Sequence, residues 1–139
     1  MSRVDKYQLK LQQEIDSRAS FMSDTKWKAL FSLLKDVNPQ YVTKVKLLLD
    51  DTIREFTIPD EESFLNEKYI EEYWGVFELK EIEWILIPSE IISERKNREE
   101  LLTSKVKTQN IELIETALQT GKQFEYELSK SGLKVYGYK

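Results

Sequence analysis

Two glutamates have the spacing of a possible catalytic pair. Glu81 and Glu83 flank Ile82 beside Trp84 in the stretch EIEW. Side chains two positions apart on a regular strand point to the same face, so the carboxylates could act together. Such pairs perform acid–base catalysis when burial drives their pKa values apart. No nucleophile motif or glycine-rich loop accompanies them, so we expect two solvent-facing glutamates on a sheet, with a carboxylate enzyme as the alternative.

The composition removes most other catalytic chemistry. The 139 residues include no cysteine and no histidine. Disulfides, thiol catalysis, Ser-His-Asp catalysis and zinc sites built on thiolates or imidazoles are therefore excluded within the chain. An enzyme would have to use carboxylates, lysine, tyrosine or a hard metal ion held by carboxylates. We expect no cofactor and assign no catalytic residue.

The charge of the chain is concentrated in one acidic segment. Between positions 50 and 72, nine acids and two bases give −7, so the rest of the chain sums to +3 against a net charge of −4. The acids are Asp50, Asp51, Glu55, Asp60, Glu61, Glu62, Glu67, Glu71 and Glu72. Carboxylates could gather oxygen ligands for Ca²⁺ or Mg²⁺, but the glycine and ligand spacing of a calcium loop are absent, so we expect no metal site.

Aromatic residues interleave with these acids and suggest a binding surface. An acidic surface would speed the encounter with a basic protein, and buried aromatic side chains would hold the complex. The candidate partner-binding residues are Glu61, Glu62, Glu67, Tyr69, Glu71, Glu72, Tyr73 and Trp74. The alternative is a solvated acidic loop whose aromatic side chains lie in the core.

Nucleic acid and membrane partners are not expected. Five bases between positions 95 and 107 are mixed with acids, whereas nucleic-acid-binding proteins usually have an overall basic balance. The apolar runs are too short to span a bilayer, and the first residues lack an apolar signal core. We expect a cytoplasmic protein.

Three segments place apolar residues three and four positions apart, which predicts amphipathic helices. They are residues 3–19, residues 23–36 and residues 108–121. Thr108 is expected to cap the third helix and Gly121 to end it. Residues 89–107 are also expected to be partly helical.

Alternating apolar residues predict two hairpins. The first joins residues 40–49 to residues 52–59 through a tight turn at Asp50-Asp51, and the second joins residues 123–128 to residues 133–139. The acidic connection between positions 59 and 73 is expected to hold a short helix.

One further strand, over residues 75–88, changes the phase of its alternation at Lys80-Glu81. We attribute this change to a bulge rather than a turn, because one extra residue shifts the phase. The continuous apolar run at positions 84–87 predicts a central strand covered on both faces.

These elements predict an α+β fold. We expect an antiparallel sheet of about five or six strands, two N-terminal helices and at least one further helix packed on the sheet. We predict that residues 1–22 form a helical extension and that residues 23–139 form a single domain.

Three short motifs resemble a family of small bacterial proteins classed as a domain of unknown function. They are TKWKALFSLL at 25–34, KEIEWILI at 80–87 and GLKVYGYK at 132–139. The resemblance runs from about Asp24 to the end and implies no activity or site residue. The architecture also resembles that of small α+β immunity proteins that neutralise bacterial toxins, which is an analogy at the level of fold.

The leading hypothesis is a non-catalytic protein-binding module. In this interpretation the acidic aromatic surface binds a basic partner, as an immunity-type inhibitor of a basic bacterial toxin would. The alternatives are the carboxylate enzyme, with or without a metal ion, and a homo-oligomeric structural protein joined through the N-terminal helix or the terminal hairpin.

Overall fold

The computed structural model describes residues 2–37, 41–58, 69–93, 105–120 and 123–139. These ranges contain helices, strands and one 3-10 turn. They are α1 (Arg3–Asp16), α2 (Asp24–Val37), β1 (Thr43–Leu47), β2 (Asp50–Phe56), β3 (Tyr69–Glu72), β4 (Gly75–Glu78), η1 (Leu79–Glu81), β5 (Ile82–Pro88), β6 (Glu90–Ser93), β7 (Lys105–Thr108), α4 (Ile111–Leu118), β8 (Tyr126–Ser129) and β9 (Gly132–Tyr136). The predicted α+β class is confirmed.

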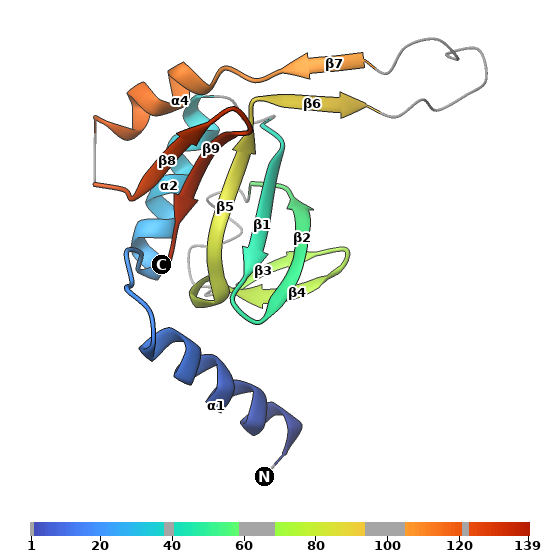
Figure 1. Ribbon diagram of the computed structural model, residues 1–139, viewed down its shortest axis with the longest axis vertical. Helices are drawn as coiled ribbons and strands as arrows, with labels where there is room; N and C mark the ends of the chain where they lie inside the picture. The colour runs from blue at the N-terminus through green and yellow to red at the C-terminus, as the bar shows by residue number, and fades with distance from the viewer. Residues whose placement is uncertain (1, 38–40, 59–68, 94–104, 121–122) are drawn as a thin grey trace, which may run out of the picture.

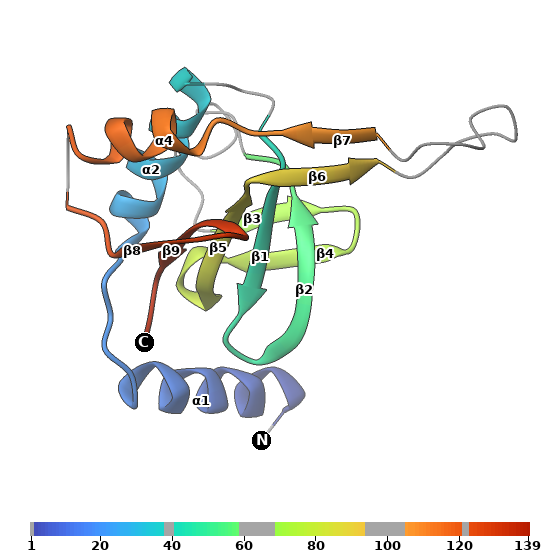
Figure 2. The ribbon, with the colours of Figure 1, turned by 45° about the horizontal axis from the view of Figure 1, so that its top comes forward.

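A five-stranded antiparallel sheet forms the centre of the molecule, in the order β2-β1-β5-β9-β8 (Figure 1). Two further pairs, β3-β4 and β6-β7, form separate two-stranded sheets. Figures 1 and 2 both show β6 and β7 projecting beyond the body of the protein. No helix within the described ranges is long and apolar enough to cross a membrane.

The core lies between one face of the sheet and helices α2 and α4. Phe31 on α2 is fully buried, stacks on Trp27 at 5.8 Å between ring centroids and meets the edge of Phe56 from β2. Ile114 of α4 belongs to the same apolar cluster as Ile85 of β5. The predicted apolar stripes of these helices therefore form the core.

Strand β5 is central, as its apolar run predicts. Every side chain from Ile82 to Pro88 is buried except that of Leu86, which is half-buried. Ile85 and Ile87 face the helices, while Trp84 is covered on the other face by Lys134, whose Nζ lies 4.3 Å from the ring centroid.

The predicted acidic turn at Asp50-Asp51 is wrong. Leu47 pairs with Asp50, so the two-residue turn is Leu48-Leu49, and both aspartates begin β2. Leu48 is buried against Leu11 of α1, which explains why two leucines occupy a turn. A tertiary contact thus overrides the usual preference for polar turn residues.

The phase change at Lys80-Glu81 comes from neither a bulge at that position nor a simple hairpin turn. The 3-10 turn η1 carries the chain from β4 in one sheet to β5 in another. A register shift does occur further along, because Lys46 pairs with Trp84 while Leu47 pairs with Ile82. Glu83 is therefore an extra residue of β5 that has no partner of its own in β1.

Two predicted helical segments are strands where the structure describes them. Tyr69–Glu72 is β3, and residues 59–68 lie outside the described residues. Glu90–Ser93 and Lys105–Thr108 pair as β6 and β7, consistent with their β-branched residues, and residues 94–104 lie outside the described residues. Thr108 ends β7, so the cap of α4 is Asn110, whose side chain accepts the Leu113 N–H at 3.1 Å. Gly121 lies outside the described residues.

The segment after α1 pairs with the C-terminus. Ala19 and Lys139 exchange two backbone hydrogen bonds of 3.0 Å, and the Phe21 N–H donates to the Gly137 carbonyl at 2.9 Å. A Cβ at Gly137 would collide with the carbonyl oxygen of Ile82, so the close approach of the C-terminal segment to β5 needs glycine there. The N-terminal segment is therefore fixed to the sheet by backbone as well as by side chains.

Candidate functional site

The β3-β4 hairpin turns through Tyr73 and Trp74, whose side chains have opposite environments. Trp74 stacks on Phe77 at 5.3 Å, and its Nε1–H donates to the Glu55 carbonyl at 2.9 Å. The Arg54 guanidinium also lies over the tryptophan ring, 5.0 Å from its centroid. Tyr73, in contrast, is 92% exposed. Trp74 therefore anchors the turn to β2, and Tyr73 stays in solvent.

Further apolar surface is exposed on the outer face of this hairpin. Tyr69 and Val76 are 48% and 62% exposed, and Glu71 is paired with Val76 in the register. Ile70 and Phe77, which pair on the opposite face, are buried in the core. The hairpin is thus amphipathic, with two tyrosines, a valine and an acid directed outward.

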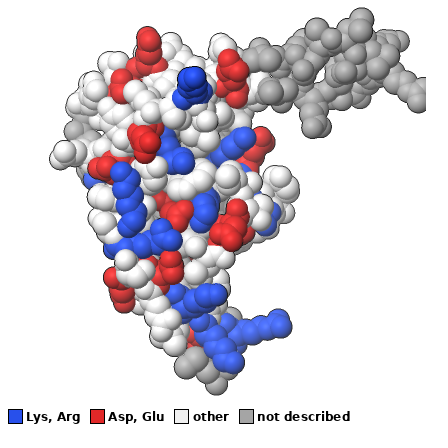
Figure 3. All heavy atoms as spheres, viewed as in Figure 1, with Lys and Arg blue, Asp and Glu red and all other residues white. Residues whose placement is uncertain are grey.

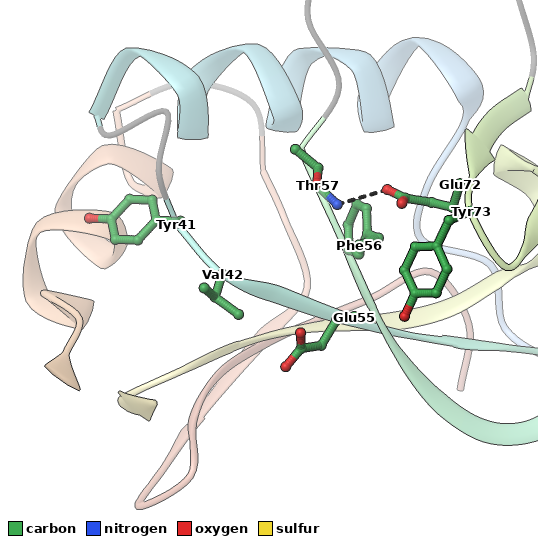
Figure 4. Close-up of a pocket in the computed structure, with 7 residues that line it drawn as sticks. All are labelled: Tyr41, Val42, Glu55, Phe56, Thr57, Glu72 and Tyr73. Carbon is green, nitrogen blue, oxygen red and sulfur yellow. Dashed lines mark hydrogen bonds between the residues drawn. The ribbon is translucent and has the colours of Figure 1, made fainter. Parts of the chain in front are cut away.

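A hollow of about 310 Å³ lies between this turn and the start of β1 (Figure 4). In that view Val42 and Glu55 extend to one side of β1 and β2, whereas the Phe56 ring extends the other way, toward α2, and the Tyr73 ring reaches from the hairpin toward β2. The hollow is therefore lined by the residues before β1, by the end of β2 and by the hairpin turn.

The two carboxylates that line the hollow differ in their partners. Glu72 Oε1 accepts the Thr57 N–H at 2.8 Å and so closes the outer edge of β2. Glu55 is exposed, and within the part of the chain that the structure describes its carboxylate forms no ion pair. Glu55 is therefore the carboxylate available to a ligand.

The structure places half of the predicted partner-binding residues, Tyr69, Glu71, Glu72 and Tyr73, on one hairpin. Tyr69 and Glu71 lie on its outer face, whereas Glu72 points the other way and lines the hollow. Trp74 is half-buried on the core, so it holds the turn. Glu61, Glu62 and Glu67 lie outside the described residues.

The sequence patterns did not indicate three residues of the hairpin and its hollow, namely Val42, Glu55 and Val76. Glu55 belongs to the acidic segment, and its alternation with buried Phe56 is a signal that it faces outward. Val42 and Val76 carried no signal, because an isolated valine in a strand is more often part of the core.

The prediction that Glu81 faces solvent is wrong, because the residue is only 7% exposed. Its Oε1 accepts a hydrogen bond from the Tyr7 hydroxyl of α1, and its Oε2 accepts the Glu78 N–H at 2.6 Å. Burial, followed by the hydrogen bond to Glu81, raises the pKa of the Tyr7 hydroxyl above its ordinary value. Glu81 thus binds α1 to the end of the sheet.

Glu83 is also buried, at 9% exposed, contrary to the prediction. Its Oε1 lies 2.8 Å from Arg18 Nη1, and its Oε2 lies 3.0 Å from Lys46 Nζ. All four oxygens of Glu81 and Glu83 therefore have partners within the chain, and the pair joins the N-terminal segment to the sheet. A strand pattern could not reveal these partners, since they come from distant segments.

Charges of both signs are interspersed over the uncovered face of the sheet (Figure 3). Cross-strand neighbours have opposite charge, as in Lys44 with Glu55 and Lys134 with Glu127. Within the described ranges, no three acidic side chains gather in a way that could hold a metal ion. The acidic, aromatic hairpin with its hollow is therefore the strongest candidate site.

The family model described as "Family of unknown function (DUF6678)" matches residues 10–139. The chain belongs to this family. The match begins inside α1, earlier than the start near Asp24 that the three motifs indicate, and it covers most of the chain, as the resemblance implied. No curated protein and no solved structure matches the chain. The division between residues 22 and 23 stays a prediction.

Proposed function

We propose that this chain is a protein-binding module that holds a basic partner on the hairpin surface, defined as Tyr69, Glu71, Glu72, Tyr73 and Val76. The observation that carries the proposal is the 92% exposure of Tyr73 beside an anchoring Trp74. The turn needs one aromatic residue for its attachment to β2, so folding gives no reason for the second. Exposed tyrosine with a rigid backbone is typical of interface hot spots.

The charges of the hairpin surface determine which partner it favours. Glu71 lies opposite Val76 on the outer face, Glu72 lines the hollow together with Tyr73, and Glu55 lines the same hollow without an ion-pair partner among the described residues. An acidic rim accelerates encounter with a basic protein and makes the association sensitive to salt. The role we propose is that of an immunity-type inhibitor, which would cover the basic substrate-binding surface of a bacterial toxin.

An affinity experiment tests this proposal. The tagged chain is used to capture proteins from lysate of its own cells, with a low-salt wash followed by a high-salt wash and mass spectrometry. We expect a basic protein in stoichiometric amount that leaves at high salt. Tyr73→Ala and Glu71→Lys should abolish its capture, whereas Glu112→Lys should not, because Glu112 is an exposed glutamate on α4.

Two results would contradict the proposal. Capture that is equal for Glu71→Lys, Tyr73→Ala and the unchanged chain would show that the hairpin surface is not the binding site. Recovery of further copies of the same chain as the sole product would favour the homo-oligomeric alternative.

A further inference from the structure

We infer that the hollow beside Tyr73 is a recognition pocket for a single arginine side chain of the basic partner. This inference rests on the proposed function and specifies which group of the partner the site reads. The volume of about 310 Å³ is at the low end of pockets that bind small molecules, which begin near about 300 Å³, so it suits one long side chain.

The lining supplies what the two ends of an arginine need. Val42 offers apolar contact for the methylene groups, and the exposed ring of Tyr73 offers a face on which a guanidinium can stack. The Glu55 carboxylate lines the same hollow as both residues. A planar guanidinium can form two parallel hydrogen bonds to a carboxylate, which a lysine ammonium cannot.

A similar arrangement already exists within the chain, where β2 meets the hairpin turn. Arg54 lies over the ring of Trp74 at 5.0 Å, and its Nε lies 3.3 Å from the Asp50 carboxylate. Trp74 thus lies with a guanidinium and a carboxylate. The hollow has the ring of Tyr73 and the carboxylate of Glu55, and among the described residues no cation lies over that ring or within ion-pair distance of that carboxylate.

One positive charge of the chain lies next to this pocket. Lys44 is opposite Glu55 in the β1-β2 register and lines an adjacent hollow of about 210 Å³ that shares Val42 and Glu55. With Glu55 and Glu72 ionised, these three groups sum to −1, so the pocket still attracts a cation. Lys44→Gln should therefore strengthen arginine binding by removing a nearby like charge.

The test is a titration of the full ¹⁵N-labelled chain with N-acetyl-L-arginine amide, followed by amide chemical shifts. N-acetyl-L-citrulline amide is the control ligand, because it has nearly the same shape without the charge. We expect saturable shifts at Glu55, Thr57 and Tyr73 with arginine below about 50 mM, where a weak millimolar site fills, and not with citrulline. N-acetyl-L-lysine amide should bind several-fold more weakly.

Variants separate the pocket from general attraction to an acidic protein. Glu55→Gln should weaken arginine binding about tenfold. Tyr73→Leu should also weaken arginine binding, whereas Tyr73→Phe should leave it unchanged because the aromatic ring is kept. Glu112→Gln on α4 removes the same charge elsewhere and should leave the titration unchanged. Equal binding of citrulline, an unchanged titration in Glu55→Gln, or no saturable shift in this region would overturn the inference.

The outcome is distinguishable from failure of the proposed function. If a basic protein is still captured through Glu71 and Tyr73 while the arginine amide does not bind, the pocket assignment fails and the proposed function stands. If the amide fills the pocket and the hairpin variants do not alter any capture, the proposed function fails and the pocket assignment stands.

Discussion

Arg18 and Glu83 form an ion pair in which Nη1 of the arginine lies 2.8 Å from Oε1 of the glutamate. Arg18 follows α1, whereas Glu83 lies on the central strand β5, so the pair connects the N-terminal segment to the middle of the sheet. Lys46 of β1 contacts the second oxygen of the same carboxylate at 3.0 Å. One mostly buried carboxylate thus balances two cations from different elements.

Replacement of Glu83 with glutamine should lower the free energy of unfolding by about 1 to 3 kcal/mol. Both cations would keep their positions and lose their counter-charge, and the partial exposure of Arg18 keeps the loss below that of a fully buried pair. Glu14→Gln is the matched control, because Glu14 also contacts Arg18 but on the surface, where such pairs contribute about 0 to 1 kcal/mol. Urea unfolding measures both, and equal effects would contradict this account of Glu83.

Docking of α1 should depend on Leu11 and not on Leu9. Leu11 is buried against Leu48 and Tyr138, whereas Leu9 on the same helix is about half exposed. Leu11→Ala should therefore lower the free energy of unfolding by about 2 to 3 kcal/mol, and Leu9→Ala by less than about 0.5 kcal/mol. If chemical denaturation finds the two variants alike, α1 does not pack as described.

The hydroxyl of Tyr7 should make stability fall at alkaline pH. Its folded-state pKa is raised above the ordinary value of 10.0, so the folded chain holds this proton more tightly than the unfolded chain does. The contribution is fully present below about pH 10 and is lost as pH rises further. Tyr7→Phe should therefore make the free energy of unfolding fall less steeply above pH 10, as measured by urea titrations at several pH values. Identical slopes for the two proteins would argue against the Tyr7–Glu81 contact.

Local sequence patterns predicted the parts of the fold that depend on periodicity. The stripe containing Trp27 and Phe31, the run at positions 84–87 and the terminal hairpin all lie where predicted. Each of these signals records which face of one element is apolar, and that face packs on the core.

The errors occur where a distant segment decides the structure. Leu48 lies in a turn because α1 covers it, and Glu83 is buried because Arg18 and Lys46 reach it. The same reason explains the exposed hairpin, since Tyr73 and Trp74 are adjacent and only the position of β2 decides which ring is buried. A pattern within one segment contains no information about such partners.

The two aromatic residues of the β3-β4 turn should therefore respond in opposite ways to replacement by alanine. Trp74→Ala removes the stack on Phe77, the hydrogen bond to Glu55 and the contact with Arg54, and should lower the free energy of unfolding by about 2 to 3 kcal/mol, less than a fully buried tryptophan. Tyr73→Ala removes an exposed ring and should change it by less than about 0.5 kcal/mol. Thermal and urea unfolding of both variants measure this difference. A Tyr73→Ala protein that is as unstable as Trp74→Ala would mean that the tyrosine serves folding, and its exposure would then no longer support a binding role for this turn.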